Sequence, residues 1–417
     1  MKRLGIKHWI DNNKIRFYYC QMYQQRQLAP ALRQALAGFP AILLTGPRQS
    51  GKTTFLRHET GEQVDYISFD DPLERDFAAV DPAGFLGRFT DRPVILDEIQ
   101  YVPALLSHLK MRIDNEPGLC GRWLLTGSQQ FGLMRDVSES LAGRVAILEL
   151  PPFSQVEFAR PDLEDVLWNG GYPIPAMYPD RRDIWLRGYV STYIERDVRQ
   201  IRNIPDLRVF NQFLNLAATR HSQEFHPADL SRELGITQPT VKSWGGVLEA
   251  SYVAHFLSPW FRNYGKRVVK TPKFYFYDAA LVNLLTRQPD AASALAGPMG
   301  GPLLEGWVVT EAVKAFMSLG RKPDLYFWRS HDGLEVDLLV VIDGKLQPVE
   351  IKLTATPGAG HVEPINRFLA VAGDEASRQG ILVCRTETER TLPNGHIAMP
   401  WQSFPDWLRK RLSKAVA

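Results

Sequence analysis

The sequence reads Gly46-Pro47-Arg48-Gln49-Ser50-Gly51-Lys52-Thr53-Thr54 at the point that decides its fold. This stretch matches the phosphate-binding spacing G-x-x-x-x-G-K-[ST] and follows the apolar run Ala41–Thr45, so it predicts a strand, a loop and a helix. Its two glycines let successive backbone N–H groups face a phosphate, and the helix start adds its dipole. We expect all nine residues to line a nucleotide site, with Lys52 on the β- and γ-phosphates and Thr53 on Mg²⁺.

A second motif, residues 94–98, completes this predicted site. It is an apolar strand that ends in Asp97 and Glu98. Asp97 is placed to hold Mg²⁺, and Glu98 is placed to orient water on the γ-phosphate as a general base. The bland alternative for Glu98 is a surface carboxylate at a strand end. A further strand with a polar end, residues 124–129, makes Ser128 or Gln129 a candidate for sensing the γ-phosphate.

Strand-like apolar runs alternate with longer amphipathic stretches from residue 28 to 150. The strand candidates are Ala41–Thr45, 64–69, Val94–Asp97, Trp123–Thr126 and 145–150. This alternation predicts a parallel sheet covered by helices, which is an α/β fold.

The bulk properties exclude several classes of protein. The length of 417 residues suggests two or three domains, and a net charge of +3 gives no evidence for or against nucleic-acid binding. Three scattered cysteines and no apolar run of about 18 residues argue against a disulfide framework, a zinc site and a membrane span, which leads us to expect a cytoplasmic protein. Residues 1–21 are either an extension outside the fold or an arm packed on it.

These motifs resemble those of the AAA-type ATPases. The likeness is greatest to a prokaryotic group, related to archaeal ATPases and STAND-like proteins, that adds a C-terminal domain of unknown function. It rests on GPRQSGKTT (46–54), SFDDP (68–72), VILDEIQ (94–100), LLTGSQ (124–129), SLAGRV (140–145), NGGYP (169–173) and YIERDV (193–198). The resemblance implies a positive side chain near the γ-phosphate. Arg144 is our candidate, acting in its own chain or in a neighbouring subunit of a homo-oligomer, and a structural salt bridge is the alternative.

The middle of the chain is predicted to be helical. Residues 151–205 resemble the lid and connector of an AAA-type module, with arginines and acids that suit a salt-bridged surface. In residues 206–298, a helix over 228–234 ends at Gly235, and a second helix begins at Gln238 with a proline in its first turn, which is a helix-turn-helix. The segment 252–277 resembles the hairpin of a winged helix.

DNA is the partner that this module suggests. The second helix offers Gln238, Thr240, Lys242 and Ser243 to a groove. The hairpin adds cations, interleaved with aromatic residues, that suit phosphates. These cations are Arg262, Lys266, Arg267, Lys270 and Lys273. A packing or protein-interaction module remains the alternative.

A hairpin is predicted in the C-terminal part, residues 299–417, from Asp343-Gly344 between two apolar runs. A two-residue turn pairs Ile342 with Lys345, which sets Asp337 opposite Glu350 and Glu335 opposite Lys352. Apolar residues at alternate positions form the other face: Val336, Leu338, Val340, Ile342, Val349, Ile351 and Leu353. Opposed carboxylates call for a cation, and their oxygen atoms suit Mg²⁺ or Mn²⁺.

This arrangement resembles the PD-(D/E)XK nuclease fold, with Glu350-Ile-Lys352 as its E-x-K part. The resemblance implies a metal held by Glu305, Asp337 and Glu350, and a Lys352 that activates water. Val336 stands where the motif has proline, and charges balanced by Lys352 alone are the alternative. Together these observations predict residues 22–150 as an ATPase domain that binds ATP and Mg²⁺, followed by residues 151–205, 206–298 and 299–417. We expect action on DNA, with metal-dependent cleavage, or else an ATP-switched interaction protein whose nuclease-like domain is inactive.

Overall fold

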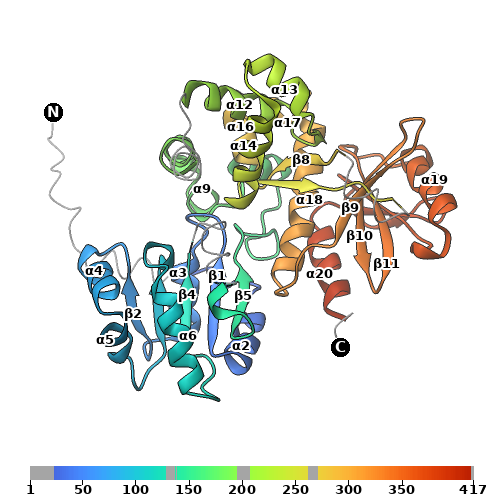
Figure 1. Cartoon of the computed structure of the whole chain (residues 1–417). Helices are drawn as coiled ribbons and strands as arrows, with labels where there is room; N and C mark the ends of the chain where they lie inside the picture. Colours follow the sequence, from blue (N-terminus) through green and yellow to red (C-terminus); the bar gives the residue numbers. More distant parts are fainter. Residues whose placement is uncertain (1–22, 128–136, 138, 195–206, 262–270, 415–417) are drawn as a thin grey trace, which may run out of the picture.

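The computed structural model describes residues 23–127, 137, 139–194, 207–261 and 271–414. Three parts follow one another along the chain: a parallel sheet with its helices, a mainly helical middle, and a mixed sheet (Figure 1). A long helix, α18 (Gly300–Met317), lies between them. The fold is α/β, as expected.

The first sheet has five parallel strands in the order β2-β3-β4-β1-β5. Its strands are β1 (Ala41–Thr45), β2 (Asp65–Ser68), β3 (Val94–Asp97), β4 (Trp123–Thr126) and β5 (Val145–Glu149). The five predicted strands are confirmed, with the second and fifth shortened at their ends.

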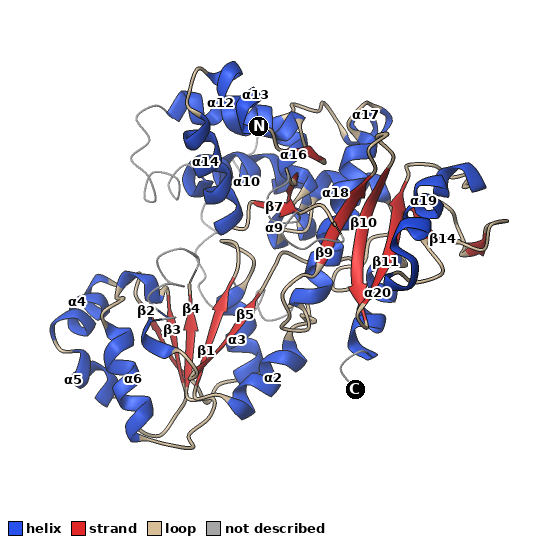
Figure 2. Ribbon diagram, turned by 45° about the vertical axis from the view of Figure 1, so that its right-hand side comes forward, coloured by secondary structure: helices blue, strands red, loops and turns tan. Residues whose placement is uncertain are grey.

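Helices cover both faces of this sheet because alternate strand residues point to opposite sides. Leu43 and Leu96 pack with one group of helices, and Ile42 and Ile95 pack with another. The first group is α4 (Pro72–Val80), α5 (Pro82–Gly87) and α6 (Leu105–Asn115), and the second is α2 (Ala29–Gly38) and α3 (Lys52–Thr60) (Figure 2). Because the five strands are parallel, their carboxyl ends all lie at one edge of the sheet, where the predicted loop follows β1.

Short helices lead from this sheet into the middle of the chain. They are α8 (Leu163–Asn169), α9 (Pro173–Met177), η3 (Pro179–Arg181), α10 (Arg182–Tyr189) and the π-helical Val190–Ile194. The next elements are α12 (Leu207–Thr219), β6 (Gln223–Glu224), α13 (Pro227–Leu234), α14 (Gln238–Ala250), β7 (Ala254–Leu257) and β8 (Lys273–Phe276). The three strands form an antiparallel sheet with β8 in the centre.

The predicted helix-turn-helix is present. Gly235 ends α13 in the left-handed conformation, with φ of 67°. The hydroxyl of Thr237 caps α14 by accepting a hydrogen bond from the N–H of Thr240. The wing cations Arg262, Lys266, Arg267 and Lys270 lie outside the described residues.

Helix α18 is buried over most of its length, and the apolar core around it is continuous from Leu163 to Leu412. It is preceded by α16 (Ala279–Leu285) and α17 (Ala291–Ala296), which pack in the same core. The expected boundary between residues 298 and 299 therefore falls inside one core, so the middle and C-terminal parts are packed as a unit.

The second sheet has the strand order β13-β14-β12-β11-β10-β9. Its strands are β9 (Leu325–Arg329), β10 (Glu335–Ile342), β11 (Lys345–Ile351), β12 (Ile381–Cys384), β13 (Arg390–Thr391) and β14 (Ile397–Pro400). Helices α18 and α20 (Phe404–Lys414) share the core on one face, and α19 (Glu363–Ala372) packs on the other. The described residues also include three further short 3-10 helices: η2 (Ile99–Tyr101), η5 (Ala359–Val362) and η6 (Gly373–Glu375).

The predicted register of the hairpin is confirmed. Ile342 pairs with Lys345 and Leu339 pairs with Pro348. The turn residues Asp343 and Gly344 both have positive φ, 52° and 74°, which is typical of a two-residue turn. No helix in the described part of the chain is long and apolar enough to cross a membrane.

One expectation about this hairpin was wrong. Val336 packs with Leu339 and Leu346, whereas Leu338 and Val340 belong to the core around α18. The pairing of β10 with β9 is irregular between Val336 and Leu339. A bulge there breaks the strict alternation, so the acidic start of β10 is turned relative to the rest of the strand.

Candidate functional site

The phosphate-binding loop has the backbone conformation that its glycines predict. Gly46 and Gly51 have φ of 137° and 93°. A Cβ atom at position 46 would lie 2.4 Å from the carbonyl oxygen of Leu150, so no larger residue fits there. Gly51 directly precedes α3, whose first residue is Lys52. The N-terminus of this helix therefore faces the loop, ready to receive an anion.

Lys52 lies folded over the loop. Its ammonium group donates to the carbonyl oxygens of Gly46 and Pro47, at 3.0 and 2.9 Å. Ser50 is fully buried, and its carbonyl oxygen accepts a hydrogen bond from Arg26 at 2.9 Å. The loop is thus fixed from behind by Arg26, a residue that the sequence analysis did not single out.

Thr53 and Asp97 meet as the two motifs predict. The hydroxyl of Thr53 donates to the Asp97 carboxylate, 3.0 Å from Oδ2 and 3.2 Å from Oδ1. The Tyr66 hydroxyl donates to Oδ2 at 2.8 Å, and the Thr126 hydroxyl donates to Oδ1. A hydroxyl beside a carboxylate, next to a phosphate-binding loop, is a donor set that fits Mg²⁺.

Glu98 lies at the end of β3 in the left-handed conformation, with φ of 58°. Its backbone N–H donates to the hydroxyl of Thr126 at 3.2 Å, and its carboxylate accepts from the Gln100 amide. The side chain is half-buried at the same edge of the sheet as Asp97. The candidates Ser128 and Gln129 lie outside the described residues.

Arg144 is wrongly placed for a role at the nucleotide site of its own chain. It comes directly before β5, and its carbonyl oxygen accepts a hydrogen bond from the N–H of Ala41, the first residue of β1. The phosphate-binding loop follows the last residue of β1, so Arg144 and the loop lie at opposite ends of this strand. The guanidinium group of Arg144 donates two hydrogen bonds to the carboxylate of Asp114, with lengths of 2.6 and 3.0 Å. This pairing lowers the pKa of Asp114.

Tyr252 connects the helix-turn-helix to the nucleotide site. It follows α14 and is 4% exposed. Its hydroxyl lies 2.9 Å from the hydroxyl of Thr45, the residue before the loop, and donates to Glu149 at the end of β5 at 2.7 Å. Thr45 and Tyr252 are 207 positions apart, so the contact depends on tertiary packing and no local sequence motif indicates it.

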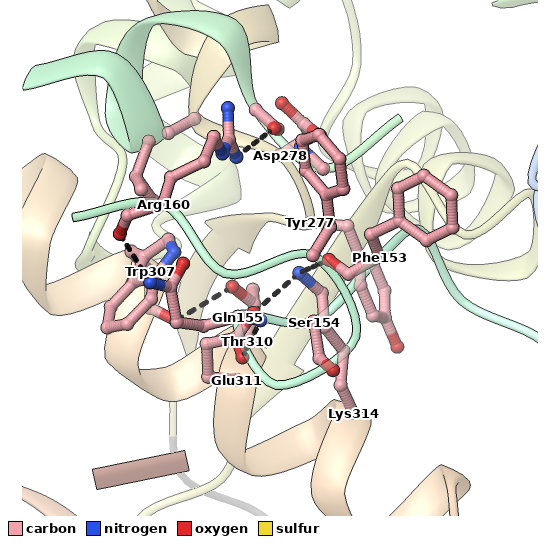
Figure 3. A pocket seen from close by; sticks show the side chains of 15 residues that line it. Phe153, Ser154, Gln155, Arg160, Tyr277, Asp278, Trp307, Thr310, Glu311 and Lys314 are labelled. Carbon is pink, nitrogen blue, oxygen red and sulfur yellow. Dashed lines mark hydrogen bonds and ion pairs between the residues drawn. The ribbon is translucent and has the colours of Figure 1, made fainter. Parts of the chain in front are cut away.

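A second junction joins α18 to the segment after β5. Lys314 donates to the carbonyl oxygen of Phe153 at 3.0 Å and to Glu311 at 2.8 Å (Figure 3). Glu311 accepts from the N–H of Gln155 at 2.9 Å. The cavity among these residues measures about 10 Å³, room for about one water molecule. This junction is therefore a packed polar contact rather than a ligand site.

The helix-turn-helix presents part of its expected face to solvent. Gln238 and Lys242 are exposed on α14, and Thr240 and Ser243 are half-buried. The hydroxyl of Thr240 lies 2.8 Å from that of Thr237. Of the four predicted side chains, Gln238 and Lys242 are thus the most available to a partner.

The C-terminal hairpin brings Asp337, Glu350 and Lys352 together. The Lys352 ammonium lies 3.3 Å from Asp337 Oδ2 and 2.5 Å from Glu350 Oε1. Asp337 Oδ2 also accepts from the N–H of Ile351 at 2.8 Å. Glu350 is 1% exposed, and its Oε2 has no hydrogen-bond partner among the described residues. Burial, and then the neighbouring Asp337, raises the pKa of Glu350 well above its usual range.

Glu305 reaches this cluster from α18, but its partner is unexpected. It accepts from the Lys273 ammonium and from the Tyr275 hydroxyl, each at 2.8 Å. Lys273 also pairs with Glu335, and its side chain is 3% exposed. Burial alone would lower the pKa of Lys273, but the carboxylates of Glu305 and Glu335 outweigh it and raise that pKa. The prediction that Lys273 contacts DNA was therefore wrong, and neighbouring Phe274 is in the core.

Glu335 also differs from its predicted place opposite Lys352. Its carboxylate is held by Lys273 and by Arg329, whose Nη2 lies 2.6 Å from Oε2. One carboxylate oxygen each of Glu335, Glu305 and Asp337 lies within 4.8 Å of the others. The bulge in β10 explains the change, because it turns Glu335 toward β9 and β8 instead of β11.

Three family models match consecutive segments of the chain. An AAA domain matches residues 38–159, and two domains of unknown function, DUF8612 and DUF4143, match residues 160–292 and 300–404. Two curated proteins, "Uncharacterized protein Rv2008c" of Mycobacterium tuberculosis and "Uncharacterized protein Mb2031c" of Mycobacterium bovis, are each 34% identical over 347 residues. The match covers 81% of this chain and 76% of each relative.

Similar solved structures match only loosely. A DNA replication initiation factor is 12% identical, covering 59% of this chain and 79% of its own, with a TM-score of 0.26. A single-residue variant of RuvB from Thermotoga maritima is 16% identical, covering 59% and 89%, with a TM-score of 0.24. Protein VC1899 from Vibrio cholerae is 11% identical, covering 90% and 98%, with a TM-score of 0.23. Because these TM-scores are low, the three matches support no conclusion about this chain.

Proposed function

Because this chain belongs to the family that includes the two mycobacterial proteins and carries an AAA domain, we propose that it couples ATP hydrolysis to an action on DNA. The observation that carries the proposal is the contact of Tyr252 with Thr45. Through it, the residue that follows the second helix of the helix-turn-helix touches the residue that precedes the phosphate-binding loop. A nucleotide that shifts the loop would therefore act directly on the module that we assign to DNA.

At the nucleotide site, each residue has a role that its position supports. Lys52 neutralises charge on the β- and γ-phosphates once it leaves the carbonyl oxygens of Gly46 and Pro47. Thr53 and Asp97 would hold Mg²⁺, which supplies charge compensation to the phosphates when bound. Glu98 orients the attacking water, and its carboxylate is held by Gln100. Arg144 is exposed enough to serve a neighbouring copy, and it would first have to leave Asp114.

The order of elements supports a DNA-binding module. A helix, a strand, two helices and two further strands follow one another, with β8 central in the sheet, and this is the order of a winged helix. In such modules the second helix of the pair enters the major groove. Gln238, Thr240 and Lys242 would then face DNA, and the wing residues Lys266, Arg267 and Lys270 would face phosphates.

The test is ATP turnover with and without double-stranded DNA. We expect stimulation by DNA, and an affinity for DNA that falls steeply with salt. Lys242→Ala should reduce the slope of that salt dependence by about one. Lys410→Ala is the matched control, since it removes an exposed lysine on α20, outside the module.

An unchanged turnover, with no DNA binding at low salt, would contradict the proposal. It would favour the second class of function, an interaction protein whose ATP state switches the binding of a protein partner. The same Tyr252 contact would then transmit the nucleotide state to a protein surface on α14.

Metal-dependent cleavage of DNA is a second candidate function. The observation in its favour is that Asp337, Glu350 and Lys352 lie together, as in the nuclease fold that they resemble. Incubation with plasmid, single-stranded and branched DNA in Mn²⁺ or Mg²⁺ tests it, with Asp337→Ala as the control. Absence of cleavage on every substrate, with and without ATP, would remove it.

A further inference from the structure

The acidic cluster of the C-terminal part already holds a cation that belongs to the chain. The geometry points to Lys273 as the resident cation of Glu305 and Glu335, in the place that a divalent metal would need. This inference goes beyond the proposed function, and it argues against the second candidate, because metal-dependent cleavage at this cluster would need a place for the metal.

The contacts of Lys273 are those of a fixed ligand rather than a surface charge. Its ammonium group lies 2.8 Å from Glu305 Oε1 and is also paired with Glu335. The ring of Phe327 lies below it, with its centroid 5.6 Å from Nζ. Only 3% of the side chain is exposed, so water cannot take over the charge.

The backbone that delivers this ammonium group is also fixed. Lys273 is the first residue of β8, the central strand of its sheet, where it pairs with Glu224 on one side and Leu257 on the other. Phe274, Tyr275 and Phe276 follow it and are fully or almost fully buried. Withdrawing Lys273 would therefore require β8 to leave the core.

A second lysine faces the other two carboxylates of the cluster. Lys352 contacts Asp337 and Glu350, as Lys273 contacts Glu305 and Glu335. One ammonium group thus lies between the two carboxylates of each pair. Lys273 is the first residue of β8, and Lys352 directly follows β11. Each ammonium group thus offsets part of the repulsion within its pair of carboxylates without any added ion.

A divalent metal does not fit this arrangement as it stands. The group that could hold one consists of Glu305, Glu335 and Asp337, and two of its three members are bound to Lys273. Mg²⁺ and Mn²⁺ need carboxylate oxygens at about 2.1 Å, and an ammonium group on the same Glu305 oxygen at 2.8 Å excludes such an ion by volume and by charge. At Glu305 and Glu335, a metal would enter only where Lys273 leaves.

Mn²⁺ binding to the full-length protein tests this inference. Asp97→Asn provides the background, because it removes the carboxylate that would hold metal at the nucleotide site, and no nucleotide is added. In that background we expect no Mn²⁺ bound at the C-terminal cluster by electron paramagnetic resonance. Adding Lys273→Met should create one Mn²⁺ site at the cluster. Adding Asp337→Asn as well should remove it.

Two outcomes would overturn the inference. One is a Mn²⁺ site in the Asp97→Asn protein that Asp337→Asn abolishes, since Lys273 would then not exclude metal. The other is a folded Lys273→Met protein that gains no site. If Lys273→Met does not fold, the first measurement still decides, because it uses a chain that keeps Lys273. Lys273→Arg is the control that retains a cation, and it should bind no Mn²⁺ at the cluster.

Discussion

The nucleotide site and the C-terminal acidic cluster are both built from carboxylates and a lysine, yet they come about in different ways. The nucleotide site comes from two short segments, residues 46–54 and 94–98, and its lysine rests on carbonyl oxygens of its own loop. The acidic cluster draws on β8, α18, β10 and β11, and its two lysines are tied to its acids. The lysine of the first site contacts neutral carbonyl oxygens, whereas the two lysines of the second are paired with carboxylates.

The largest effect is expected at Lys52. Lys52→Ala removes the cation that faces the phosphates, so ATP binding and turnover should fall to the background. A filter-binding assay with labelled ATP and a phosphate-release assay measure the two losses. Lys345→Ala, on the exposed hairpin turn, is the control and should leave both unchanged. Substantial turnover in the Lys52→Ala protein would place the nucleotide elsewhere.

In the C-terminal acidic cluster, the largest effect is expected at Lys273. Lys273→Met leaves the half-buried Glu305 and Glu335 without the buried cation that they share, and breaking a buried ion pair costs about 3–5 kcal/mol of stability. Lys352→Met should cost less, because the Lys352 side chain is 41% exposed and water can replace part of its charge. Denaturant unfolding of the two proteins gives the comparison. An equal loss in both would show that Lys273 is not specially placed.

Glu98 separates binding from hydrolysis. Glu98→Gln keeps the shape of the side chain and its neighbour Gln100, so ATP affinity should persist while turnover falls by about a hundredfold or more. Single-turnover kinetics with prebound ATP measure the hydrolytic step. Turnover at the wild-type rate would remove Glu98 as the base, and the carboxylate would then have only a structural role at the strand end.

The sequence predicted the features that depend on neighbouring residues better than the contacts between distant ones. The strands, the loop and the hairpin register were predicted because each depends on residues close in sequence. Arg144 was predicted to act near the γ-phosphate, but the predicted strand at 145–150 already implied the opposite edge, since parallel strands all start there. Lys273 and Tyr252 could not be placed, because their partners lie 32 and 207 positions away and only packing brings them together.

The bulge in β10 shows a subtler limit. The alternation of apolar residues predicted one core face from Val336 to Ile342, and the structure breaks it between Val336 and Leu339. A single irregularity moves Glu335 from Lys352 to Lys273 without changing the hairpin register. No residue type in this stretch marks the bulge, so the composition of the charged cluster could be predicted but its pairing could not.

A smaller effect is expected from pH. The pKa of Glu350 is raised in the folded protein by burial and by Asp337, so the folded state binds a proton that the unfolded state releases above a pH of about 4.5. Stability should therefore fall as the pH rises from 4.5 toward the raised pKa, by at most about 1.4 kcal/mol per pH unit for this group. Glu350→Gln should flatten that slope. Equal slopes in both proteins would contradict the assignment.

The number of metal ions per chain tests the central contrast most directly. Full-length protein would be saturated with a non-hydrolysable ATP analogue and titrated with Mn²⁺, and the bound ion counted by electron paramagnetic resonance. One ion per chain is the predicted result, held with the nucleotide near Thr53 and Asp97 and lost in Asp97→Asn. A second ion that Asp97→Asn leaves in place and Asp337→Asn removes would show that the acidic cluster takes a metal despite Lys273.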